Sequence, residues 1–160
     1  MKPESIAQRV IKNIATNRRA RHDYEIVSVY EAGIVLNGTE VKSLRANQCS
    51  LQDAHCKFLN KDSLELFVYN FYINPYEHGS YSNHIPKRPK KLLLKYRELK
   101  KIKVAVIEKG IAVIPLSIYF SGHLAKIELG LCRAKKKYDK REAKKERETK
   151  REIDRKFKFR

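Results

Sequence analysis

The sequence lacks the paired cysteines that cross-link small secreted domains. It has three cysteines, Cys49, Cys56 and Cys132, so any intramolecular disulfide scheme leaves one thiol unpaired. Cys49, His55 and Cys56 have no second close pair of ligands and match no common zinc spacing. We therefore expect reduced thiols, no bound metal and a cytoplasmic protein.

Long apolar runs are also missing from the start of the chain. In residues 1–16 the apolar side chains recur every three or four positions among polar ones, which excludes a signal peptide or a membrane span. This spacing predicts an amphipathic helix over residues 1–16, packed on the domain and not laid on a membrane. No Gly-Lys-Ser loop for a nucleotide phosphate is present.

Acidic residues are too few to balance the basic ones. The chain has 36 Lys and Arg against 18 Asp and Glu, a net charge of +18. Residues 133–160 alone carry 15 Lys and Arg against 6 Asp and Glu, and Ala143 is the only nonpolar residue between Tyr138 and Ile153. This composition predicts a solvated cationic arm that needs an anionic partner, and nucleic acid is the leading one.

Residues 17–132 have the pattern of one mainly β domain. Strands are expected at 24–36 (two pieces around Gly33), at 54–59 and 64–71 as a hairpin across residues 60–63, and at 112–120 and 125–131 as a second hairpin turning at Gly122. Helices are expected at 40–46, capped by Thr39, and at 92–108, stopped by Gly110, although residues 104–107 could instead begin a strand. Pro115 requires an edge or a bulge in its strand. Without regular strand and helix alternation, we expect a small closed antiparallel barrel with flanking short helices.

Two segments have the composition of an RNA-binding surface. Residues 17–24 combine three arginines with an amide, an imidazole and an aromatic ring, which suits folded RNA better than DNA, so DNA is not expected as a partner. A solvated charged turn is the alternative. Residues 74–89 form a long loop that is rich in proline, tyrosine and histidine, a composition typical of functional loops.

Four stretches resemble the bacterial small protein B family of tmRNA-binding proteins. They are NRRARHDYEIVSVYEAGIVLNGTEVKSLR (17–45), INPYEHGSYSNHIPKRPKKLLL (73–94), VIPLSIYF (113–120) and KKYDKRE (136–142). The resemblance implies an OB-like barrel and an RNA-binding factor without enzymatic activity or cofactor. Such a factor binds the tRNA-like domain of tmRNA and, with elongation factor Tu, enters ribosomes stalled on an mRNA that lacks a stop codon (trans-translation, or ribosome rescue).

The resemblance also assigns roles to residues. The expected RNA-binding residues are Asn17, Arg18, Arg19, Arg21, His22, Tyr24, Glu31, Lys42, Arg45, Tyr76, Asn83, His84, Arg88, Lys91 and Leu92. Glu31 could accept hydrogen bonds from RNA or orient an arginine, but a buried strand-end ion pair is equally compatible with its position. For Leu92, a core position is the stronger alternative.

The arm is expected to occupy the empty decoding site against small-subunit rRNA. Its predicted contacts there are Lys135, Lys136, Lys137, Tyr138, Asp139, Lys140 and Arg141. We expect an arm that is disordered in the free protein and helical on the ribosome, because its residues favour a helix but lack an apolar stripe. Ile153, Phe157 and Phe159 are its only late apolar residues.

Two alternatives compete with this interpretation. His22, His78 and His84 could act as acid and base in a nuclease, although catalysis needs a mutual geometry that a sequence does not display. A ribosomal protein or a general RNA chaperone would share the charge and the barrel. Preference for the tRNA-like domain at elevated salt separates the specific binder from the general one.

Overall fold

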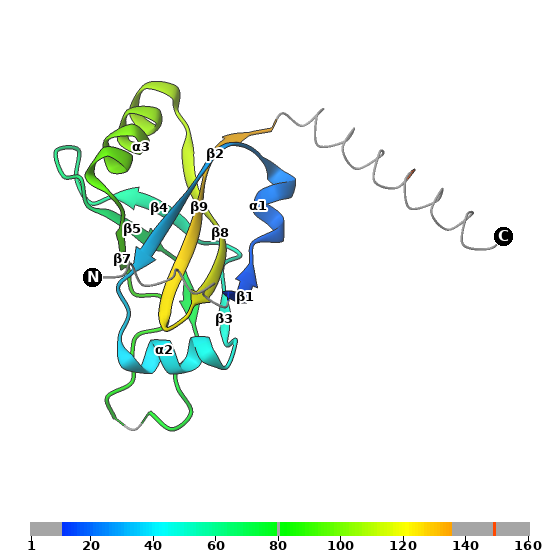
Figure 1. Cartoon of the computed structure of the whole chain (residues 1–160), viewed down its shortest axis with the longest axis vertical. Coiled ribbons are helices and arrows are strands. Elements are labelled where there is room, and N and C mark those ends of the chain that lie inside the picture. The colour runs from blue at the N-terminus through cyan, green and yellow to red at the C-terminus, as the bar shows by residue number, and fades with distance from the viewer. Residues whose placement is uncertain (1–10, 80, 136–148, 150–160) are drawn as a thin grey trace, which may run out of the picture.

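A computed structural model describes residues 11–79, 81–135 and 149 of the chain. The described part is mainly β, and its elements pack around one apolar core (Figure 1). The strands are β1 (Ile11–Thr16), β2 (Tyr24–Ile34), β3 (Cys49–Ser50), β4 (His55–Phe58), β5 (Leu66–Tyr69), β6 (Tyr72–Ile73), β7 (Lys90–Leu93), β8 (Ala112–Ser121) and β9 (Leu124–Ala134). The helices are α1 (Arg18–Asp23), α2 (Gly38–Arg45) and α3 (Tyr96–Lys109).

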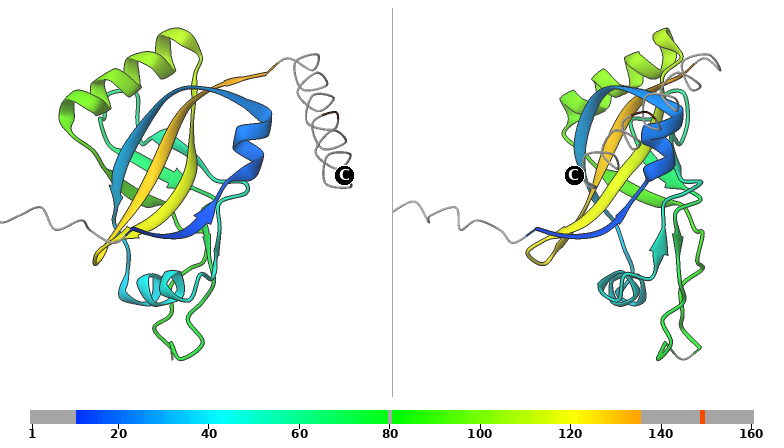
Figure 2. Two further views of the ribbon diagram at one scale, coloured as in Figure 1. Left: turned by 45° about the vertical axis from the view of Figure 1, so that its right-hand side comes forward. Right: turned by 90° about the vertical axis from the view of Figure 1, so that its right-hand side faces the viewer.

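Seven of these strands form one large antiparallel sheet. Its order is β1-β8-β4-β5-β7-β2-β9, and β9 also pairs with β8. The short strands β3 and β6 form a separate two-stranded sheet. In both views of Figure 2 the long strands β2, β8 and β9 curve strongly and α2 lies at one end. The left view shows α3 and α1 on opposite sides of these strands.

The hairpin of β8 and β9 forms where the sequence predicts it. Apolar and polar residues alternate along β9 from Lys126 to Leu129, whereas the first half of β8 is buried on both faces, between two apolar clusters. The turn between the strands places Gly122 at a φ of +63°, which glycine adopts without strain. The register shifts between Pro115 and Ser117, so the predicted bulge at the proline is confirmed. A side chain at Gly130 would meet Leu116, whose Cδ1 lies 3.0 Å from the position of an added Cβ.

The start of the described chain contradicts the predicted N-terminal helix. Residues 11–16 form β1, which pairs with β8 from Ile11 opposite Ser121 to Thr16 opposite Ser117. Pairing with an available strand outweighs the helical spacing of the apolar residues. The domain therefore includes β1, while residues 1–10 of the predicted helix lie outside the described residues.

Two further boundaries differ from the prediction. Residues 24–34 form one continuous strand, and the bulge lies between Ile26 and Ser28 and not at Gly33. The predicted helix over 92–108 begins four residues later, at Tyr96, because residues 90–93 form β7 between β5 and β2. Gly110 ends that helix in the left-handed conformation, as expected.

The apolar core joins the sheet to α2 and α3. Leu44 of α2, Ile102 of α3 and Leu66 of β5 are all fully buried in it. A smaller apolar cluster fixes α1 through Ala20, which packs with Leu116. Among the described residues, no helix has the length and apolar character needed to cross a membrane.

Candidate nucleic-acid interface

Asn17 holds the basic helix α1 in place. Its side-chain oxygen accepts a hydrogen bond from the backbone N–H of Ala20 (3.0 Å), which caps the helix. Its Nδ2 donates to the carbonyl oxygens of Leu51 (3.0 Å) and Pro115 (3.2 Å). Asn17 is buried and both of its amide hydrogens are engaged, so its position suits anchoring α1 to the sheet.

The arginines of α1 have different surroundings. Arg18 and Arg21 are exposed. Arg19 lies between two carboxylates, 3.4 Å from Asp23 and 3.7 Å from Asp53, at a polar hollow of about 370 Å³. The Nδ1 atom of His22 also lies 3.0 Å from Asp23. Arg18 and Arg21 therefore remain the cations of α1 best placed to meet phosphate.

A second basic region combines residues 37–48, around α2, with the loop of residues 74–89; we call it the α2 lobe. The ammonium group of Lys42 lies over the ring of Tyr76 at 5.1 Å, and that ring meets His78 edge-on. Asn83 holds the loop closed by donating to the Tyr76 carbonyl (2.8 Å) and accepting from the Tyr76 N–H (3.1 Å). Arg45 is exposed on the same helix.

Buried charged side chains hold α2 and the loop of the α2 lobe together. Arg88 forms a two-pronged ion pair with Glu40, with nitrogen to oxygen distances of 2.9 and 2.5 Å. Lys90 lies 3.6 Å from the same carboxylate and donates to the carbonyl oxygens of Phe71 and Arg88 at 3.1 Å each. Burial lowers the pKa of Lys90, and Glu40 partly opposes this shift.

His84 is also part of this support. Its side chain is buried, with Nδ1 3.0 Å from the Thr39 hydroxyl and Nε2 3.2 Å from the Ile73 carbonyl. Of the residues predicted to contact RNA, His84 and Arg88 therefore join the loop to α2 and β6. Thr39 was expected to cap α2, but its hydroxyl contacts His84. Asn37 occupies the N-cap position of α2 instead.

Glu31 lies on the sheet surface in an ion pair, but an exposed one. Its carboxylate accepts hydrogen bonds from the ammonium of Lys126 on β9 and from the hydroxyl of Tyr119 on β8. These two bonds lower the pKa of Glu31, that of Lys126 having the larger effect. Its side chain is 52% exposed, so the buried ion pair considered from sequence is wrong. Lys126 and Tyr119 were not predicted as site residues from the sequence, although they face each other in the predicted hairpin.

Lys91 and Leu92 lie on β7, apart from both basic regions. Lys91 pairs with Glu65 of the neighbouring segment, and both side chains are partly exposed. Leu92 is only 2% exposed and belongs to the main core, whereas Leu93 is 53% exposed. Core packing is therefore the role that burial supports for Leu92.

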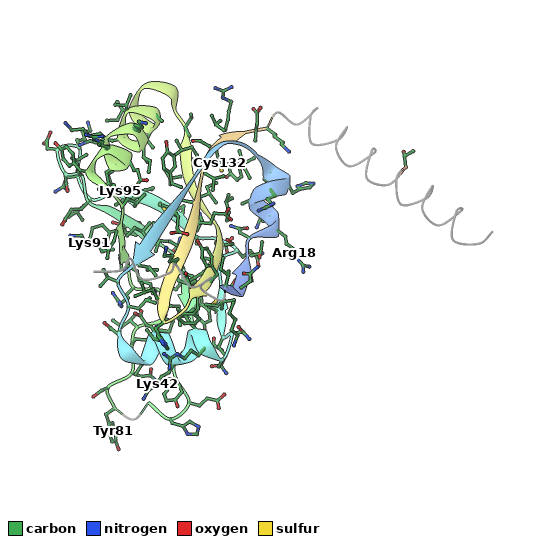
Figure 3. The ribbon with its side chains drawn as sticks, in the orientation of Figure 1. Arg18, Lys42, Tyr81, Lys91, Lys95 and Cys132 are labelled. Atoms are coloured by element: carbon green, nitrogen blue, oxygen red, sulfur yellow. The ribbon has the colours of Figure 1, made fainter. Side chains whose placement is uncertain are left out.

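The predicted residues gather in separate places on the molecule. Figure 3 shows Arg18 on the α1 side, Lys42 at the α2 end and Lys91 on the opposite edge from Arg18. Within the α2 lobe the structure brings together Lys42 with Tyr76, and Glu40 with Arg88.

Of the predicted decoding-site contacts, Lys135 is the only one within the described residues. Its backbone N–H donates to the Asp23 carbonyl at 3.2 Å, which ties the end of β9 to the end of α1. Residues 136–141, Ile153, Phe157 and Phe159 lie outside the described residues.

The three cysteines form no disulfide; Cys56 and Cys132 are buried and Cys49 is half-buried. Burial raises the pKa of Cys49 and Cys132 to about 11, and it raises that of Cys56 further. Within the described ranges, no group of three or more His, Cys, Asp or Glu side chains could hold a metal ion.

Comparison with known proteins gives one consistent family. The model of the family described as "SmpB protein" matches residues 14–159. The "SsrA-binding protein" of Carboxydothermus hydrogenoformans is 50% identical over 89% of this chain and 94% of its own, and that of Pelotomaculum thermopropionicum is 49% identical over 94% and 96%.

A solved structure agrees with these relatives. A chain in the structure described as "tmRNA-SmpB: a journey to the center of the bacterial ribosome" is 50% identical to this one. The similarity covers 77% of this chain and 85% of that chain, with a TM-score of 0.64. This chain therefore belongs to the SmpB protein family.

Proposed function

We propose that this chain binds the tRNA-like domain of tmRNA and carries it to stalled ribosomes in trans-translation. The observation that carries the proposal is the match to SsrA-binding proteins at about half identity over nearly the whole chain. The similarity to a chain from a tmRNA-SmpB ribosome structure supports the same function. The chain acts in the cytoplasm as an RNA-binding factor and not as an enzyme, with elongation factor Tu in the delivery complex.

The described surface offers groups that suit folded RNA. Exposed cations on α1 and on the α2 lobe can neutralise phosphates, and the Tyr76 ring offers a face for stacking. Glu31, with Lys126 and Tyr119, adds a donor and acceptor set on the sheet between these regions. We assign direct contact to Arg18, Arg21, Lys42, Arg45, Tyr76 and this Glu31 set.

A second group of predicted residues acts by positioning. Asn17 fixes α1, while His84 and Arg88 fix the loop of the α2 lobe. Removing these side chains would therefore weaken RNA binding by displacing the residues that touch RNA.

The sheet itself is proposed to be a closed OB-like barrel. β9 pairs with β2 on one side and with β8 on the other, and β8 leads back through β4, β5 and β7 to β2. This circuit of pairings supports closure, which would leave no free edge among these six strands. β1 pairs with β8 and lies outside this closed series of strand pairings.

The cationic arm is assigned to the empty decoding site and mRNA channel. Its charge, +9 over residues 133–160, suits a track lined by rRNA phosphates. Arm residues would fold as a helix there because rRNA neutralises their mutual repulsion.

Binding at elevated salt tests the proposal against a general RNA-binding function. The full chain is titrated with labelled tRNA-like domain and with an unrelated duplex of equal length, at about 200 mM salt, where phosphate contacts alone are weak. A preference of at least about 100-fold for the tRNA-like domain is expected. Equal affinities that fall together as salt rises would instead indicate a general binder.

Truncation separates the domain from its arm. A chain that stops after Lys135 keeps all of β9 and the bond to Asp23, so the sheet is left intact. It should keep its affinity for the tRNA-like domain and lose peptide tagging on stalled ribosomes in a reconstituted translation system. Loss of affinity at moderate salt would contradict this division of roles.

A further inference from the structure

An apolar groove runs along α3. This helix lies across the long strands from α1 (Figure 1). Two adjoining hollows of about 560 and 440 Å³ form the groove, and Lys103 and Ile107 line both. The opposite wall is the β4–β5 hairpin, including Phe58 and Leu64. Neither hollow contains residues that we assign to RNA contact.

The groove wall on α3 is an exposed stripe and not part of the core. Tyr96, Lys100, Val104 and Ile107 recur at spacings of four and three, which places them on one helix face. Val104 is 50% and Ile107 67% exposed, while the core side of the same helix carries the fully buried Ile102. Such clustered exposed aliphatic residues are typical of interaction surfaces.

Lysines surround this apolar floor. Lys57, Lys61, Lys100 and Lys103 line the two hollows, against one carboxylate, Asp62. Lys103 holds the walls together, since its ammonium donates to the Ser63 carbonyl at 3.1 Å. The occupant must therefore bring both aliphatic side chains and negative charge.

These properties favour a protein segment over RNA or the cationic arm. A lysine lies over one face of each aromatic ring near the groove, Lys100 at 4.6 Å from the Tyr96 ring and Lys103 at 5.9 Å from that of Phe58. The floor itself, formed by Val104 and Ile107, is aliphatic and offers RNA bases neither an aromatic face nor a hydrogen-bonding group. The arm's own +9 charge opposes the lysine rim.

We propose that the α3 groove docks an acidic amphipathic segment of a partner protein, whose aliphatic side chains cover Val104 and Ile107 and whose carboxylates meet the lysine rim. Helix-in-groove recognition uses this combination of apolar anchors and flanking charge. His55 lines both this groove and the hollow beside α1, but no residue assigned to RNA contact lines the groove, so the segment and RNA can bind together.

Selection from a phage-displayed library of random 16-residue peptides on the full-length protein tests the proposal. Enriched peptides should combine spaced Leu, Ile or Phe with Asp and Glu. A synthetic, fluorescein-labelled copy of the strongest binder is then measured by anisotropy, and its site is mapped by ¹⁵N NMR on the unaltered chain. Shifts should centre on α3 and the β4–β5 hairpin.

Variants identify the contributions of the floor and the rim. Ile107→Ser should weaken the peptide at least about tenfold, as expected for an apolar anchor. Lys57→Glu with Lys61→Glu should weaken it similarly, while Arg97→Glu with Lys101→Glu, the same charge change at exposed α3 positions outside the groove, should change it less than about threefold. These side chains are exposed, so the fold is retained.

Several results would overturn the inference. These are no enriched peptide, enrichment of basic peptides, shifts confined to α1 or the α2 lobe, or displacement of the peptide by a model RNA duplex that itself loses affinity in Ile107→Ser. Sedimentation that shows dimers of the protein, lost in the same variant, would assign the groove to a second copy instead.

Discussion

The two roles considered for Leu92, core packing and RNA contact, lead to opposite expectations for Leu92→Ala. Because its side chain fills the core, Leu92→Ala should lower the free energy of unfolding by about 2 to 5 kcal/mol. Leu93→Ala, at an exposed neighbouring position, should cost less than about 1 kcal/mol. Urea denaturation measures both. If Leu92→Ala kept full stability but lost RNA affinity, a direct contact would replace the core role.

Glu31 gives a pH-dependent prediction. Its folded pKa lies below the ordinary value of 4.5, so its ion pair contributes to stability above that pH and is lost as pH falls through the lowered pKa. Removing the partner with Lys126→Met should return the pKa of Glu31 towards 4.5. Carboxyl ¹³C NMR titration checks this, with Lys57→Met as the control. An unchanged pKa would show that Lys126 does not hold the carboxylate in solution.

The partners of Glu31 show how far residue-level prediction reaches. A turn at Gly122 between the two predicted strands implies that Tyr119 faces Lys126, so this pair was available from sequence. That Glu31 lies beside them was not, because the pairing of β2 with β9 joins segments about 95 residues apart.

At the scale of elements, the buried charges beneath the α2 lobe set its stability. Glu40→Gln leaves Arg88 and Lys90 without their counter-charge, and should cost about 3 to 5 kcal/mol. Hydrogen exchange should also increase in the loop of residues 74–89. The matched change Glu65→Gln, at a half-exposed pair, should cost less than about 1 kcal/mol. Similar losses for both variants would contradict the supporting role of Glu40.

Strands that pair with a neighbour in the sequence were predictable, and strands that pair with distant segments were not. The two hairpins were expected from strand-like segments joined by turn residues, and both are confirmed. β1 was mistaken for a helix because the three-residue spacing of Ile11 and Ile14 is helical, and the pairing with β8 overrides it. Likewise the run of three leucines from Leu92 fits a helix or a strand until its neighbours β5 and β2 are known.

At the scale of the whole molecule, the two basic regions should contribute separately to RNA affinity. Arg18→Ala with Arg21→Ala should lower the slope of log affinity against log salt by about 1 to 2, and so should Lys42→Ala with Arg45→Ala. The two double changes should add, since α1 and the α2 lobe lie far apart (Figure 3). Arg97→Ala with Lys101→Ala, on α3, is the control. An unchanged slope in either pair would remove that region from the interface.

The strand β9 fixes where the arm leaves the domain. It starts at the turn near the α2 end and finishes at Ala134, opposite Tyr24, where Lys135 bonds Asp23 (Figure 1). Its eleven residues, at about 3.4 Å each, follow a curved path about 37 Å long. The length of β9 therefore sets the distance between the α2 lobe and the start of the arm. Lengthening this strand would misplace the arm even if every contact residue were kept.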